Sequence, residues 1–107
     1  MLQLGASDHD RTVALPVGET VHITLPENAS TGYRWAIDRC DEDIIEAQGS
    51  RALYPSAGGA AGAGGEVTFS FQARKIGSGE IVLKHWRAWE GDASVIARMA
   101  LHVNVHA

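Results

Sequence analysis

Alternation of apolar and polar residues is the feature that most limits what this chain can fold into. In the stretch VTFSFQA, residues 67–73, every second residue is apolar, and residues 97–105 repeat the pattern. A strand with one buried face has this period of two, because successive side chains point to opposite sides of a sheet. Shorter runs of the same character cover residues 11–15, 20–25, 34–39, 44–53 (with Gly49 as a candidate break) and 79–86. The chain is therefore predicted to be an all-β protein of about seven strands.

Turn-rich segments separate these runs, and helix signals are nearly absent. Short strands at this spacing are typical of an antiparallel β-sandwich of immunoglobulin type, and a β-barrel is the alternative. The 107 residues suit one domain over residues 1–107, and the single cysteine, Cys40, excludes an internal disulfide. Residues 1–10, which include His9, are expected to be a flexible N-terminal segment.

Three of the links between the predicted strands have unusual compositions. They are ENASTGY (27–33), PSAGGAAGAGG (55–65) and RAWEGD (87–92). In an up-and-down antiparallel chain successive links alternate between the two ends, so these three share one end of the sandwich. Loops gathered on a rigid scaffold commonly carry function. The arrangement indicates a binding module.

Each of these links has its own chemistry. In the first, polar side chains can hold the turn through local bonds, and Gly32 permits a positive φ or a close contact. In the second, Gly62–Gly65 could lay bare backbone against a partner's backbone. In the third, Arg87 and Trp89 are of the types enriched among binding hot spots. The competing interpretation is structural: Tyr33 is a core aromatic and Trp89 folds back as a cap on the core.

Several other functions are disfavoured. A net charge of −4 without a basic run argues against nucleic acid and membrane surfaces as partners. Cys40 lies in the stretch RCDEDI, where three neighbouring carboxylates are expected to raise the pKa of its thiol. A thiol of this kind is a poor nucleophile, and we do not expect the chain to be an enzyme. His85 is expected as a satisfied core histidine, with Trp35 and Trp86 also in the core. No metal or cofactor is expected.

Taken together, the three links resemble those of the chagasin-type inhibitors of papain-like cysteine peptidases. That family carries Asn-Pro-Thr-Thr-Gly-Tyr/Phe, Gly-X-Gly-Gly and Arg-Pro-Trp/Phe in the corresponding loops of an immunoglobulin-like sandwich. The matching residues here are Asn28, Ala29, Ser30, Thr31, Gly32 and Tyr33, then Gly62, Ala63, Gly64 and Gly65, and finally Arg87, Ala88 and Trp89. Both family prolines are alanine, at Ala29 and Ala88, which leaves the unbound loops more freedom.

The resemblance implies a reversible, tight-binding inhibitor whose three loops block the active-site cleft of a papain-like cysteine peptidase. The alternative is a non-inhibitory immunoglobulin-like module that binds another protein or a carbohydrate. We expect a soluble monomer. The chain has no signal peptide as written, which favours the cytoplasm, or the periplasm or secretion if a leader was removed.

Overall fold

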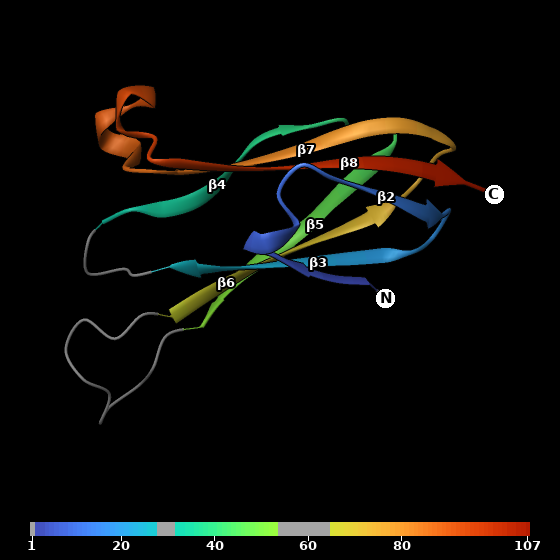
Figure 1. Cartoon of the computed structure of the whole chain (residues 1–107), viewed down its shortest axis with the longest axis horizontal. Coiled ribbons are helices and arrows are strands. Elements are labelled where there is room, and N and C mark those ends of the chain that lie inside the picture. The colour runs from blue at the N-terminus through green and yellow to red at the C-terminus, as the bar shows by residue number, and fades with distance from the viewer. Residues whose placement is uncertain (1, 28–31, 54–64) are drawn as a thin grey trace.

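The computed structural model describes residues 2–27, 32–53 and 65–107, which form two four-stranded sheets packed face to face (Figure 1). The strands are β1 (Leu2–Gly5), β2 (Arg11–Pro16), β3 (Thr20–Glu27), β4 (Arg34–Cys40), β5 (Ile45–Leu53), β6 (Gly65–Ala73), β7 (Gly77–Trp86) and β8 (Ala97–His106). One sheet has the order β1-β3-β6-β5 and the other β2-β8-β7-β4. The described residues also form short 3-10 turns, η1 (Ala6–Asp8), η3 (Ala88–Glu90) and η4 (Asp92–Ser94). The predicted β-sandwich is confirmed.

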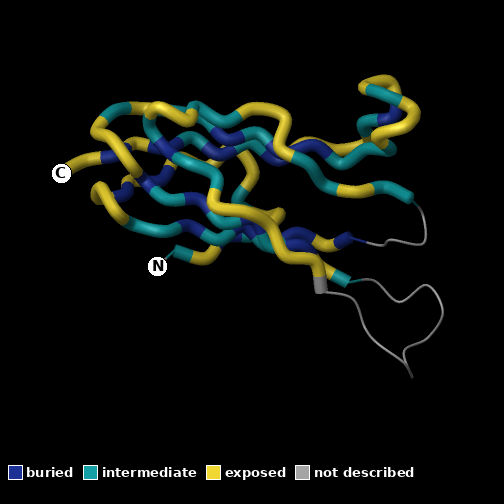
Figure 2. The backbone as a smooth tube through the Cα atoms, turned by 180° about the vertical axis from the view of Figure 1, so that it is seen from behind, coloured by how far each residue is buried: buried dark blue, intermediate teal, exposed yellow. Residues whose placement is uncertain are grey.

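The core lies between the two sheets and is built from alternate residues of their strands (Figure 2). Along β6, Val67, Phe69, Phe71 and Ala73 are buried, as the alternation predicts. Leu83 and Leu101 are among the fully buried side chains of the facing sheet. Burying each large side chain of this kind contributes about 1.5–3 kcal/mol. The core therefore holds the domain without a covalent cross-link.

The N-terminal residues correct the expectation of a flexible segment. Strand β1 pairs in parallel with β3, and Leu4 is buried. The turn that follows is held by Asp8, whose carboxylate accepts hydrogen bonds from Gly5 N at 2.9 Å and Arg11 Nη1 at 2.8 Å. These bonds lower the pKa of Asp8, the backbone bond first. His9 Nδ1 accepts a bond from Ala100 N. The segment is ordered because it completes the open edge of β3, which a local pattern does not reveal.

The strand directions also differ in part from a purely antiparallel arrangement. The pairs β3-β6, β5-β6, β7-β8 and β4-β7 are antiparallel, whereas β1-β3 and β2-β8 are parallel. The chain passes from β1 to β2 in the other sheet and back to β3, and such a crossover brings β1 and β3 together in the same direction. The register of β5 shifts between Ala47 and Gly49, where the sequence suggested a break.

The three unusual links leave from one end of the sandwich. In the first sheet Glu27 is opposite Gly65, and Leu53 is opposite Glu66. In the second sheet Arg34 of β4 is opposite Trp86 of β7, and the last pair between β7 and β8 at this end is His85 with Ala97. Figure 1 shows these strand ends on the same side of the molecule. We call this the link end, and the end with the links 17–19, 41–44 and 74–76 the turn end.

Candidate functional site

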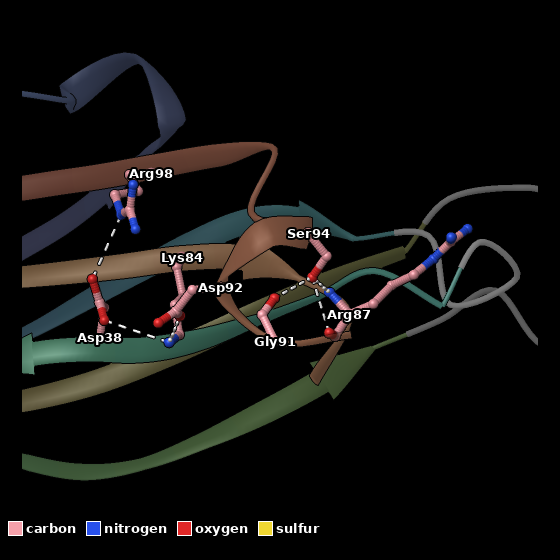
Figure 3. Close-up of polar contacts among 7 residues, drawn as sticks. All are labelled: Asp38, Lys84, Arg87, Gly91, Asp92, Ser94 and Arg98. Carbon is pink, nitrogen blue, oxygen red and sulfur yellow. Dashed lines mark hydrogen bonds and ion pairs between the residues drawn. The ribbon is translucent and has the colours of Figure 1, made fainter. Parts of the chain in front are cut away.

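The link between β7 and β8, residues 87–96, holds its own shape around one buried serine. Ser94 Oγ accepts a hydrogen bond from Arg87 N at 3.0 Å and lies 2.7 Å from Gly91 O and 2.9 Å from Arg87 O (Figure 3). Gly91 has a φ of 75°, a value that favours glycine. The turns η3 and η4 flank this centre. The link is thus a built turn that presents η3 to solvent.

Trp89 is the exposed aromatic of this link, with 72% of its surface accessible. Its indole packs on Gly32, where an added Cβ would lie 2.6 Å from Cη2 and 3.2 Å from Cζ2. Gly32 also has a φ of 80°, so both its conformation and its contact require glycine. Trp89 therefore does not fold back as a cap on the core. It joins two links while most of the ring faces solvent.

A column of rings connects this end to the core. The Arg87 guanidinium carbon lies 4.3 Å from the centre of the Tyr33 ring. Tyr33 meets His85 edge-on at 5.8 Å, and His85 stacks on Trp35 at 4.7 Å with an interplanar angle of 6°. Trp35 in turn packs against the core. The column fixes the direction in which Arg87 leaves β7, because each ring is confined by the next.

His85 and Trp86 differ from their predicted surroundings. His85 Nε2 is buried but has no hydrogen-bond partner among the described residues, so this histidine is held by ring contacts and is not fully satisfied. Trp86 lies on the outer face of its sheet, because the alternation that buries Leu83 and half-buries His85 points position 86 the other way. The ammonium group of Lys84 sits 3.6 Å from the centre of the Trp86 ring.

Glu27 joins the two sheets at the link end, and the sequence analysis did not single it out. The residue is only 3% exposed, and its carboxylate accepts bonds from Trp35 N at 3.0 Å and Arg34 Nε at 3.3 Å. Trp35 Nε1 also donates to Pro26 O at 2.9 Å. The alternation in β3 contained a usable signal, since Glu27 follows Val21, Ile23 and Leu25 on the buried face.

Residues 14–103 match the sequence pattern of a known family, the chagasin family of peptidase inhibitors (I42). The chain belongs to this family. Among its relatives, Amoebiasin-1 of Entamoeba histolytica is 28% identical over 95 residues, which are 87% of this chain and 89% of the relative.

Two solved structures illustrate the shared fold. The cysteine protease inhibitor EhICP2 from Entamoeba histolytica has a TM-score of 0.85 at 22% identity, covering 98% of this chain and 95% of that one. PbICP-C, solved in complex with falcipain-2, has a TM-score of 0.66 at 19% identity, covering 97% of this chain and 89% of that one. At these identities the likeness concerns the fold. Membership in a family of peptidase inhibitors agrees with the expectation that the chain is not an enzyme.

The predicted site residues of this family member are only partly within the described chain. The structure brings together Gly32, Tyr33, Arg87 and Trp89. Ala88 is exposed in η3, and Gly65 begins β6 opposite Glu27. Residues 28–31 and 62–64 lie outside the described residues.

Other kinds of site are not found in the described part of the chain. Cys40 lies at the turn end, where burial, followed by the charges of Glu42 and Asp41, raises its pKa to about 11. Such a thiol is a poor nucleophile, as predicted. Within residues 2–27, 32–53 and 65–107, no group of three or more histidine, cysteine or acidic side chains is placed to hold a metal ion. Across the same residues, no helix has the length and apolarity to cross a membrane.

Proposed function

We propose that this chain inhibits papain-like cysteine peptidases by inserting its link end into the substrate cleft. The observation that carries the proposal is the exposed Trp89, which is locked on Gly32 beside the Arg87-Tyr33 stack. A large ring held in water by its neighbours offers contact area at little entropic cost, as binding hot spots do. Family membership and the complex of PbICP-C with falcipain-2 support the same class of partner.

In this mechanism the three links divide the cleft among them. The β3-β4 link, from Asn28 to Tyr33, covers the catalytic cysteine and histidine, with Thr31 and Gly32 nearest. Gly62–Gly65 pair through their backbone with the groove on one side. Arg87 and Trp89 grip the other side, where stacking on an enzyme aromatic adds about 0.5–1.5 kcal/mol. The sequence of this central link is typical of a turn and not of an extended strand, so we expect no scissile bond to be presented.

Contacts between the links offset the missing prolines. With Ala29 and Ala88 at the family's proline positions, the unbound backbone gains freedom, which weakens binding. The packing of Trp89 on Gly32 and of Arg87 on Tyr33 removes part of that freedom before any peptidase arrives. Preorganisation by side chains thereby replaces preorganisation by proline rings.

Titration of active papain with the purified protein, followed with a fluorogenic peptide substrate, tests this function. We expect stoichiometric, reversible inhibition. Trp89→Ala should raise the inhibition constant at least about 30-fold, the effect of a hot-spot residue worth about 2 kcal/mol. Ile76→Ala is the matched control, because Ile76 is an exposed apolar residue (60%) at the turn end. It should leave inhibition unchanged.

Three outcomes would contradict the proposal. Absence of inhibition at micromolar protein, with circular dichroism showing the fold intact, would argue for a module that binds another protein or a carbohydrate. Equal losses from Trp89→Ala and Ile76→Ala would show that the link end has no special part in binding. Inhibition unaffected by either variant would remove Trp89 from the site.

A further inference from the structure

A charged cluster on the outer face of the second sheet contains a nearly buried lysine. Lys84 is 9% exposed, and its ammonium group lies 3.0 Å from Asp92 Oδ1 and 3.5 Å from Asp38 Oδ1 (Figure 3). The same group lies over the ring of Trp86. Asp38 also pairs with Arg98, at 3.5 Å. The hydrogen bond to Asp92 is the main cause that raises the pKa of Lys84, so the group stays protonated. Lys84 is therefore a fixed positive charge between carboxylates from two elements.

These carboxylates belong to different parts of the fold. Asp38 is on β4, within the sheet, whereas Asp92 begins η4 inside the β7-β8 link. The link leaves the sheet after Trp86, which still pairs with Arg34 of β4, whereas the last β7-β8 pair is His85 with Ala97, and His85 O accepts a backbone bond from Ile96 N. The Lys84-Asp92 ion pair consequently ties the middle of the link back to the face of the sheet.

The two holds on this link act on different parts of it. Ser94 closes the link on its own backbone, through Arg87 and Gly91. Closing the link in this way sets its internal shape, and the stacking of Arg87 on Tyr33 sets the direction in which the link leaves β7, but neither contact holds η4 against the face of the sheet. The Lys84-Asp92 pair connects η4 to a strand, and η4 is separated from η3 by Gly91 alone. The pair is thus placed to set the angle at which η3 carries Trp89 toward Gly32.

We propose that Lys84 is a positioning residue for the inhibitory end: its ion pair with Asp92 clamps the β7-β8 link in the orientation that places Arg87 and Trp89 for the peptidase. The proposal rests on the proposed function for its last step. Lys84 touches no peptidase in this scheme. It acts by limiting the orientations of the link in the free protein, which raises the fraction of molecules ready to bind.

Four variants separate positioning from general stability. Asp92→Asn and Lys84→Met each remove one charge of the clamp, and methionine keeps an apolar stem over Trp86. Asp92→Glu retains the carboxylate, and an exposed position has room for the longer side chain. Arg98→Gln is the matched control, since it breaks an ion pair of the same cluster that does not reach the link.

The first readout needs no peptidase. Hydrogen exchange of the free protein reports on the amides of Ser94 and Val95. In the structure these amides donate hydrogen bonds within the link, to Gly91 O and Asp92 O. We expect them to exchange about three- to tenfold faster in Asp92→Asn and Lys84→Met, because local opening becomes easier, and at the wild-type rate in Asp92→Glu and Arg98→Gln. The amides in the centre of β7 should keep their rates in all four variants.

The second readout is inhibition of papain. The two clamp variants should raise the inhibition constant about tenfold, mainly through a slower association rate, and Asp92→Glu should restore it. Trp89→Ala should also raise the inhibition constant by a smaller factor in the Asp92→Asn background than in the wild type, because a misplaced tryptophan contributes less to binding.

The outcomes distinguish this inference from the function on which it rests. Unchanged exchange and unchanged inhibition in both clamp variants would overturn the clamp. If Arg98→Gln weakened inhibition as much as Asp92→Asn does, the clamp would also be overturned, because both variants would then act through the general stability of the fold. If the wild-type protein fails to inhibit papain, the proposed function fails, and the exchange rates still decide whether Lys84 positions the link.

Discussion

The two ends of the sandwich are closed by different kinds of contact. At the turn end the links are tied mostly through backbone groups: Gly18 N donates to Ala73 O at 2.8 Å, Ala73 N to Glu19 O at 2.9 Å and Arg74 N to Ile44 O at 2.8 Å. At the link end, within the part that the structure describes, the ties between the links and the sheets include side-chain contacts of Glu27, the ring column and the packing of Trp89 on Gly32.

The two kinds of contact serve different purposes, stability at the turn end and a defined binding geometry at the link end. Backbone bonds close an end tightly and depend little on side-chain identity, so the turn end contributes stability and can use ordinary turn residues. Side-chain ties instead hold a chosen geometry while Trp89 stays in water. The link end is therefore specified residue by residue, and changes there should alter inhibition more than equivalent changes at the turn end.

The largest effect on stability is expected from Glu27→Ala. Removing this buried carboxylate leaves Trp35 N without its bond and should lower the free energy of unfolding by about 2–3 kcal/mol. Asp41→Ala is the counterpart at the turn end, where Asp41 Oδ2 accepts a bond from Glu80 N at 2.7 Å in a half-exposed setting. Water can replace that bond, so a loss of about 1 kcal/mol is expected. Urea denaturation measures both, and equal losses would remove the distinction between the ends.

A second test places the same substitution at each end. Gly32→Ala and Gly18→Ala both put a methyl group at a glycine of positive φ, 80° and 94°, so each should cost about 1–2 kcal/mol of stability. Among the described residues, no atom beyond those of its chain neighbours lies within 4 Å of the added group at Gly18. Only Gly32→Ala also pushes against Trp89, and it should weaken papain inhibition by about tenfold. Inhibition lost equally in both variants would show that the ring contact has no functional part.

The smallest effect on inhibition is expected at Cys40. Because its pKa is raised to about 11, the folded state disfavours the thiolate. Alkylation by iodoacetamide at pH 8 should be at least about 100-fold slower in the folded protein than in urea, where the thiol has a pKa near 8.5. The stabilising contribution of the neutral thiol is present below about pH 8.5 and lost as the pH rises toward 11. Cys40→Ala should inhibit papain as the wild type does, and rapid alkylation of the folded protein would contradict the raised pKa.

The sequence by itself determined the sandwich and the placement of its three unusual links. Alternation is a local property that survives in any window of a strand, as residues 67–73 show. The parity of successive links then places three of them at one end without knowledge of the sheet order. Gly32, Arg87 and Trp89 could be named for the same reason, since turn chemistry and residue type are both local.

Only the tertiary structure decided which residues hold that end in place. The clamp of Lys84 on Asp92, the packing of Trp89 on Gly32 and the outward position of Trp86 depend on elements that meet across the fold. The parallel pairing of β1 with β3 likewise depends on the open edge of β3, which cannot be predicted from the local sequence pattern. Side-chain contacts of this kind are set by sheet order, register and twist, which arise when the whole chain has packed.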